Sequence, residues 1–119
     1  FNAVIGFGHR ALGLGGAALE NDAVYAGVIA DGHHLHPAAL TVALKAKGSE
    51  KIMLVTDAMP SVGSDTSGFD LQGRRIRLAE GMLTDETGTL AGSHLTMAGA
   101  VGNVIAQTSA TMAQSSRMA

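Results

Sequence analysis

The sequence contains no cysteine and no tryptophan, and it has only two prolines, three phenylalanines and one tyrosine among 119 residues. The absence of cysteine excludes disulfides, thiolate zinc sites and thiol nucleophiles. Charged residues make up only 15% of the chain and the formal net charge is −2, so the composition favours neither nucleic acid nor an anionic membrane as a partner. No apolar run reaches the roughly 20 residues needed to cross a bilayer, and no signal peptide is visible. We therefore expect a cytoplasmic protein without a nucleic-acid or membrane partner.

Glycine and apolar residues, by contrast, are abundant. There are 16 glycines, and 46% of the residues are hydrophobic, a composition too apolar and too weakly charged for disorder. The length fits one ordinary domain of roughly 100–150 residues. The first residue is Phe1 rather than methionine, which predicts that the chain is processed or is part of a longer protein.

A strand, a helix and a second strand are predicted in the first half of the chain. Short apolar runs rich in β-branched residues, at 24–30 and 51–56, are typical of buried strands, and residues 38–47 between them have helical spacing. Pro37 suits the first position of that helix and Gly48 suits its end. A strand–helix–strand unit of this length predicts two parallel strands, buried on both faces.

Parallel strands bring their carboxyl ends to one edge of a sheet, where ligands bind in α/β folds. Here that edge carries a histidine-rich turn after the first strand and Asp57 after the second. The clustered His33, His34 and His36 suit a metal ion or an oxyanion, and equally a solvated loop with helix-capping histidines. A carboxylate directly after an apolar strand is costly unless it is paired or used; the alternative for Asp57 is an ordinary turn or N-cap aspartate.

The other segments are mainly connections, short strands and helices. Loops are predicted at residues 1–23, with a short helical turn near 17–20, and at residues 58–68. Short strands of a β meander are predicted at residues 69–71, 74–79 and 82–84. Helical spacing predicts a helix from about Thr96 to Thr108, and a further helix begins within residues 109–119.

Two weaker candidates for binding lie outside the strand ends. Gly92 and Ser93 are small enough to let the backbone approach a ligand closely, although the same pair is common in ordinary turns. Arg10, with His9 beside it, could hold an anion, although single surface charges usually have no such role.

Four motifs of the sequence resemble those of one family. Phe1-Asn2-Ala3 resembles the end of a Thr-His-Leu-(Phe/Tyr)-Asn-Ala-Met motif, and residues 29–34 resemble Ile-Ala-Asp-Gly-x-His. Residues 54–58 match Leu-Val-Thr-Asp-Ala, and residues 90–97 resemble Leu-(Ala/Ser)-Gly-Ser-x-Leu-Thr-Met. Along essentially all of its length the chain resembles the C-terminal portion of an N-acetylglucosamine-6-phosphate deacetylase, a family of the amidohydrolase superfamily.

The resemblance implies an α/β fold: the C-terminal part of a (β/α)8 TIM barrel, with a small β segment from an accessory β domain. Residues 1–68 would supply the last strands and helices of the barrel, residues 69–88 the small β meander, and residues 89–119 the substrate loop and the C-terminal helices. The family hydrolyses the acetamide of N-acetylglucosamine 6-phosphate to glucosamine 6-phosphate and acetate, with a divalent metal ion such as zinc.

The same resemblance implies roles for individual residues. Asp57 matches the catalytic aspartate, which takes a proton from the attacking water and delivers it to the leaving amine. His34 matches a substrate-binding histidine. Arg10 matches an arginine that binds the phosphate and can come from a neighbouring subunit, so we expect a homodimer. The other residues expected to bind the substrate are Asn2, Ala3, Leu90, Ala91 and Gly92.

Departures from the family pattern qualify this interpretation. The family's metal ligands, a glutamate and two histidines from earlier strands, are absent, so no ligand is assigned in this chain and the isolated chain is expected to be inactive. Val4 replaces a methionine and Ala11 a glutamate. The alternatives are another amidohydrolase acting on an N-acyl or cyclic amide, or a non-catalytic truncated chain. Arg10 and the Asn2-Ala3 site favour a phosphorylated sugar.

Overall fold

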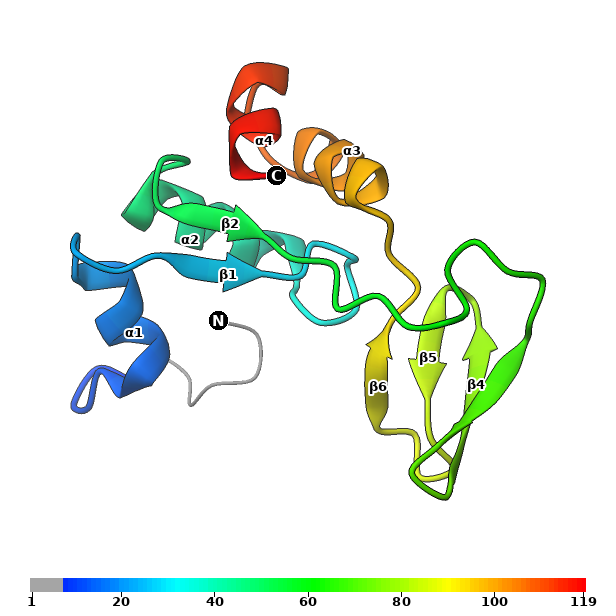
Figure 1. The fold of residues 1–119 in the computed structure, drawn as a ribbon. Coiled ribbons are helices and arrows are strands. Elements are labelled where there is room, and N and C mark those ends of the chain that lie inside the picture. Colours follow the sequence, from blue (N-terminus) through cyan, green and yellow to red (C-terminus); the bar gives the residue numbers. More distant parts are fainter. Residues whose placement is uncertain (1–7) are drawn as a thin grey trace.

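A computed structural model describes residues 8–119, which form four helices and two separate sheets (Figure 1). The helices are α1 (Gly13–Glu20), α2 (Pro37–Lys47), α3 (Met97–Gln107) and α4 (Met112–Met118). The strands are β1 (Ala26–Val28), β2 (Ile52–Leu54), β3 (Gly68–Leu71), β4 (Arg74–Ala79), β5 (Met82–Thr84) and β6 (Leu90–Ser93). The described part of the chain has an α/β fold, as the sequence predicts.

The first sheet contains β1 and β2, which are parallel and connected through α2. Both strands are shorter than the apolar runs that predict them. Helix α2 begins at Pro37, as expected, and its chain leaves the helix at Gly48, where a φ of +75° favours glycine. The predicted strand–helix–strand unit is therefore confirmed.

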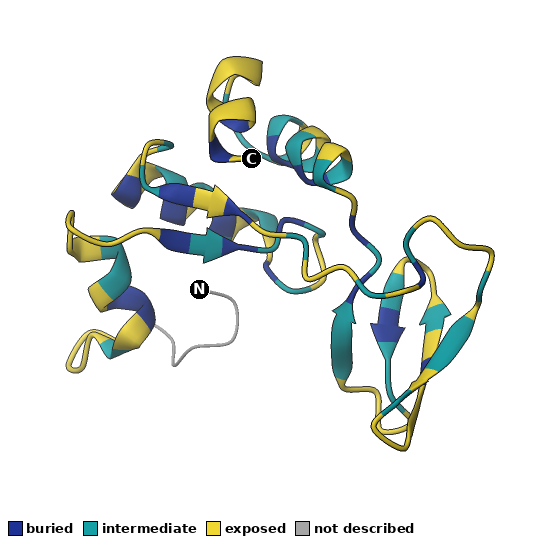
Figure 2. Ribbon diagram, in the orientation of Figure 1, coloured by how far each residue is buried: buried dark blue, intermediate teal, exposed yellow. Residues whose placement is uncertain are grey.

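One face of this sheet is buried and the other is open. Alternate residues of a strand point to opposite faces, and Val28 and Leu54 point into a core shared with Leu40 of α2 and Val104 of α3. On the opposite face Met53 is 44% exposed, and β2 alternates between buried and exposed along its length (Figure 2). The expected burial on both faces is wrong for this chain, because its own core forms on one face only.

The second sheet is antiparallel, in the order β3-β4-β5-β6. The three predicted strands of the meander are present, and Ile76 and Leu83 at its centre are fully buried. Strand β6 is a correction, since the family resemblance implies a substrate loop at Leu90, Ala91 and Gly92. Its pairing with β5 aligns Leu90 with Thr84 and contains an irregularity. A glycine within the four-residue strand, Gly92, hides the alternation that marks strands.

The two sheets are joined where the chain leaves β2. There the Ser93 N–H donates a hydrogen bond to the Asp57 carbonyl (2.8 Å), and the Met59 N–H donates one to the Ser93 carbonyl (3.1 Å). These bonds form an isolated parallel bridge between Ala58 and Ser93. The segment that follows the first sheet thus pairs with the last strand of the second.

The helices begin and end close to the predicted residues, except for α1, which is longer than the short turn expected there. Helix α3 begins after Thr96, whose hydroxyl accepts a hydrogen bond from the Gly99 N–H, and Thr108 follows its last residue. Helix α4, within the expected segment, begins with a capping box between Thr111 and Gln114. No helix in the described part of the chain is long and apolar enough to cross a membrane.

Candidate active site

The candidate site lies at the carboxyl ends of β1 and β2. Val28 is aligned with Leu54 in the parallel pair, so the segments that follow, with Asp31 and Asp57, leave the sheet at the same edge. The predicted placement of these two segments is confirmed.

A compact turn after β1 fixes the ring of His34. The Asp31 Oδ1 accepts hydrogen bonds from the backbone N–H groups of His33 (2.9 Å) and His34 (2.8 Å), and Asp31 Oδ2 lies 2.7 Å from the His34 Nδ1. The side chains of Asp31 and His34 are only 8% and 14% exposed. Because Nδ1 is taken by the carboxylate, Nε2 is the nitrogen that His34 can offer to a ligand.

The same bonds act on the acidity of Asp31. Burial raises the pKa of this carboxyl, but the hydrogen bonds from the His34 backbone, the His34 ring and the His33 backbone outweigh burial and hold the pKa below its ordinary value. Asp31 is therefore a carboxylate at neutral pH that orients His34.

The three clustered histidines do not converge on one point. The His36 Nδ1 accepts a hydrogen bond from the Ala38 N–H (3.1 Å) and so caps helix α2. His33 is exposed on the turn, with its Nε2 near Gly81 of the β4–β5 connection. No group of three or more His, Asp or Glu side chains in the described chain could hold a metal ion. The capping interpretation thus holds for His36.

Asp57 has an unusual backbone and an exposed side chain. Its φ of +52° lies in the left-handed region, which is uncommon for residues other than glycine and is found at functional sites. Its carboxylate has no hydrogen bond or ion pair with any other residue that the structure describes, whereas its carbonyl is bonded to Ser93. Asp57 therefore presents an unpartnered carboxylate on a fixed backbone.

Among the expected substrate-binding residues, Leu90, Ala91 and Gly92 lie on β6 and are half-buried. At Gly92, where φ is +74°, an added Cβ would lie 2.7 Å from the Met59 sulfur and 3.2 Å from the Asp57 carbonyl oxygen. Glycine is thus required here for close packing against the segment of Asp57. The close approach that the sequence predicts at this position is made to protein atoms.

Arg10 is exposed in the bend before α1, and it has no hydrogen bond or ion pair with another residue in the described range 8–119. The structure does not bring it into contact with Asp57 or His34. The expected contributions of Asn2 and Ala3 lie outside the described residues.

Further residues contact the segments that form the site, and most of them have no role assigned from the sequence. The Asn103 side chain of α3 donates a hydrogen bond to the Ala30 carbonyl (2.8 Å), just before the Asp31 turn. The His94 Nδ1 lies 3.0 Å from the hydroxyl of the fully buried Ser61. Ser93 pairs with the segment of Asp57. Ser93 is a weak candidate in the sequence because it is small, whereas its place in the fourth motif is the only sequence signal for His94.

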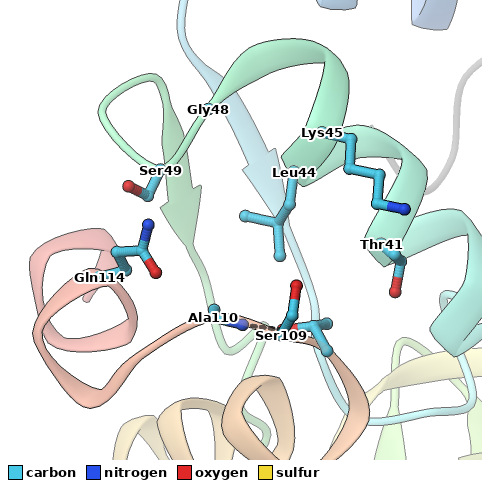
Figure 3. A pocket seen from close by; sticks show the side chains of 9 residues that line it. Thr41, Leu44, Lys45, Gly48, Ser49, Ser109, Ala110 and Gln114 are labelled. Carbon is cyan, nitrogen blue, oxygen red and sulfur yellow. Dashed lines mark hydrogen bonds between the residues drawn. The ribbon is translucent and has the colours of Figure 1, made fainter.

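A pocket of about 160 Å³ lies elsewhere, between the end of α2 and the α3–α4 connection (Figure 3). Its lining residues are Thr41, Leu44, Lys45, Gly48, Ser49, Thr108, Ser109, Ala110 and Gln114. None of the expected site residues lines it, so this pocket is separate from the candidate site.

Comparison with known proteins identifies the family. No protein-family model matches the chain. A putative N-acetylgalactosamine-6-phosphate deacetylase of Escherichia coli (strain K12) is 36% identical over 119 residues, which are 100% of this chain and 71% of that relative. This chain belongs to the N-acetylglucosamine/galactosamine-6-phosphate deacetylase family. The resemblance seen in the four motifs is confirmed, and the relatives include deacetylases named for N-acetylglucosamine 6-phosphate and for N-acetylgalactosamine 6-phosphate.

Two further deacetylases show how much of the family's length the chain represents. The N-acetylgalactosamine-6-phosphate deacetylase of Shewanella sp. (strain ANA-3) is 46% identical over 103 residues, 85% of this chain. The crystal structure of N-acetylglucosamine-6-phosphate deacetylase from Pasteurella multocida matches 93% of the chain with a TM-score of 0.88 and 33% identity. The chain spans 26% of the Shewanella deacetylase and 29% of the Pasteurella chain.

The lowered pKa of Asp31 predicts an acid-dependent loss of stability. Because the pKa is lower in the folded state, the contribution of Asp31 is present in full above its unfolded value of about 3.9 and is lost as the pH falls through the folded value. We expect Asp31→Asn to reduce the free energy of unfolding by about 1–2 kcal/mol at pH 7, since the hydrogen bonds from His33 and His34 no longer go to a charged group. The difference in the free energy of unfolding between this variant and the parent should become smaller below about pH 4.

Urea denaturation of the chain between pH 3 and pH 7 measures this dependence, with Asp65→Asn as the control. Asp65 is exposed and its side chain has no partner among residues 8–119, so its replacement should leave stability unchanged at every pH. An Asp31→Asn variant that loses as much free energy of unfolding at pH 3 as at pH 7 would contradict the stabilising role of the ionised Asp31.

Proposed function

We propose that this chain is the catalytic C-terminal portion of a deacetylase that hydrolyses the acetamide of N-acetylglucosamine 6-phosphate to glucosamine 6-phosphate and acetate. The observation that carries the proposal is Asp57, an unpartnered, exposed carboxylate at the carboxyl end of a parallel strand, in a chain that belongs to this deacetylase family. Carboxylates at such strand ends are typical catalytic groups in α/β enzymes.

The open face of the first sheet is an argument that this sheet is part of a larger barrel. Met53 in β2 is 44% exposed and Val55, the residue after β2, is 40% exposed, although both are large and apolar. In a closed (β/α)8 barrel such inward-facing residues are covered by the other strands. We propose that residues 1–68 supply the last strands and helices of a TIM barrel, residues 69–88 a small β meander of an accessory domain, and residues 89–119 the substrate-contacting strand and the C-terminal helices.

Asp57 would act as a general base and then as a general acid. Its carboxylate accepts a proton from water as the water oxygen bonds to the carbonyl carbon of the acetamide. It then gives this proton to the nitrogen as the C–N bond breaks, which releases acetate and the free amine. The carboxylate is exposed and has no hydrogen bond or ion pair with any residue in the described part of the chain, which leaves it available for water.

The remaining residues would bind and orient the substrate. His34, held through Nδ1 by Asp31, offers its Nε2 to the sugar or to the acetamide carbonyl. Leu90, Ala91 and Gly92 would contact the sugar from β6, and Arg10 the phosphate. Asn2 and Ala3, outside the described residues, would complete this set. We expect a homodimer, because the phosphate-binding arginine of the family can come from a neighbouring subunit. We also expect the protein to be cytoplasmic.

The described residues do not by themselves fit a catalytic metal ion. Three convergent ligands are a minimum for a catalytic zinc site, and no such group of His, Asp or Glu is found among residues 8–119. We propose that a divalent ion of the family takes its ligands from outside this chain, because the described residues do not supply a complete set. The proton transfers proposed for Asp57 are independent of the identity of this ion.

The second candidate substrate is N-acetylgalactosamine 6-phosphate. The Shewanella protein, which is 46% identical to this chain, is an N-acetylgalactosamine-6-phosphate deacetylase. The two sugars differ in the configuration of one hydroxyl, so the proposed roles of Asp57 and Arg10 are the same for both. An assay of the two substrates side by side separates them.

The proposal is tested in a chimera in which the matched region of the Shewanella deacetylase is replaced by this chain. We expect acetate release from at least one of the two N-acetylhexosamine 6-phosphates. Asp57→Asn should lower kcat by about 100-fold or more, with KM changed by less than threefold, because a general base contributes to the transition state more than to binding. Asp65→Asn is the control and should retain parental kcat.

Two results would contradict the proposal. One is an Asp57→Asn chimera with near-parental kcat. The other is a chimera that shows a cooperative melting transition but releases acetate from neither sugar phosphate. Hydrolysis of an N-acyl amino acid or a cyclic amide instead would favour another amidohydrolase, and no turnover at all would favour a non-catalytic chain.

Arg10→Ala in the same chimera tests the phosphate contact. Loss of a charge-assisted hydrogen bond is worth about 1.5–3 kcal/mol, so KM for the phosphorylated substrate should rise by about 10- to 100-fold. The rate with the unphosphorylated N-acetyl sugar should change by less than twofold. Arg77→Ala, an exposed arginine on β4, is the control. Equal losses for both substrates in Arg10→Ala would exclude a phosphate contact.

A further inference from the structure

Ser93 surrounds the backbone of Asp57 with hydrogen bonds. Its N–H donates to the Asp57 carbonyl (2.8 Å), its carbonyl accepts from the Met59 N–H (3.1 Å), and its hydroxyl donates to the Thr56 carbonyl. The same hydroxyl accepts a hydrogen bond from the Leu95 N–H (3.1 Å). Ser93 is only 1% exposed, so these bonds are shielded from competing water.

These bonds lie on both sides of a residue with a left-handed backbone. Asp57 has a φ of +52°, in a region that is uncommon for residues other than glycine. The carbonyls on both sides of Asp57 Cα, those of Thr56 and Asp57, are both bonded to Ser93. Fixing both peptide planes fixes the direction in which the Asp57 side chain leaves the backbone.

We propose that Ser93 is a positioning residue for the carboxylate of Asp57, an inference that rests on the catalytic role proposed for that aspartate. Its hydroxyl acts through the Thr56 carbonyl, and its backbone acts through Asp57 and Met59. Neither contact requires Ser93 to touch the substrate.

Gly92 makes this arrangement possible. A Cβ at Gly92 would lie within 2.7 Å of the Met59 sulfur and 3.2 Å from the Asp57 carbonyl oxygen. A larger residue would therefore displace the Met59 side chain and crowd the Asp57 carbonyl, in addition to the strain of a φ of +74°. Gly92 thus allows the segment of Asp57 to lie close to β6, and the hydrogen bonds of Ser93 hold that segment in place.

Ser115 offers a matched control for a buried hydroxyl. Its residue is 0% exposed, and its Oγ has no hydrogen-bond partner among the described residues. It lies in α4, whereas the candidate site is at the strand ends. Removing either hydroxyl makes the same chemical change in a buried position, but only Ser93 contacts the segment of Asp57.

The test compares Ser93→Ala and Ser115→Ala in the Shewanella chimera. We expect Ser93→Ala to lower kcat by about 10-fold or more, because small misplacements of a catalytic group are costly, with KM within twofold of the parent. Ser115→Ala should keep both constants within twofold. Ser93→Cys, which keeps the shape of the side chain but is slightly larger and a much weaker donor, should also lower kcat, and it serves if the alanine variant does not fold.

A double-mutant cycle with Asp57→Asn separates positioning from general support of the fold. If Ser93 acts through Asp57, adding Ser93→Ala to Asp57→Asn should change the remaining kcat by less than twofold. The same loss in both backgrounds, or unchanged kcat in Ser93→Ala and Ser93→Cys, would overturn the positioning role and leave the proposed function intact. Near-parental kcat in Asp57→Asn alone would instead reject the proposed function itself.

Discussion

The candidate site depends on the bridge between Ser93 and the segment of residues 57–59. It joins the parallel sheet of β1 and β2 to the antiparallel sheet that ends in β6. It also holds the left-handed backbone of Asp57 from both sides. Because the partners are more than 30 residues apart in sequence, the bridge is a tertiary contact that links the two sheets.

The two faces and the carboxyl edge of the parallel sheet differ in what they contact. Helices and strands share a core on one face of the parallel sheet, while Met53 and Val55 leave the other face apolar and open. At the carboxyl edge, Asp31 fixes the ring of His34 and Ser93 fixes the backbone of Asp57. A rigid frame around two polar groups is what acid–base chemistry on a bound substrate requires, whereas a metal site needs more ligands than the described residues offer.

Local signals in the sequence predict most of the elements. Pro37 and Gly48 mark helix α2, because their backbone preferences are intrinsic, and the alternation around Ile76 marks the meander. Strand β6 is not predictable in this way, since Gly92 breaks its pattern and only pairing with β5 makes it a strand. The open face behind Met53 depends on what packs against the sheet. The placing of His34 and Asp57 at one edge follows from parallel pairing, but the bonds from Ser93 to Asp57 depend on tertiary contacts.

Native-state hydrogen exchange of the Ser93 and Met59 amides tests the bridge most directly. Both N–H groups donate across it, so they should exchange only through the opening that also releases the Val55 amide, which donates to Val28 within the first sheet. Equal free energies of opening for these amides are the predicted result. Exchange of the Ser93 and Met59 amides at the rate of exposed loop amides, while Val55 stays protected, would contradict a bridge that fixes Asp57.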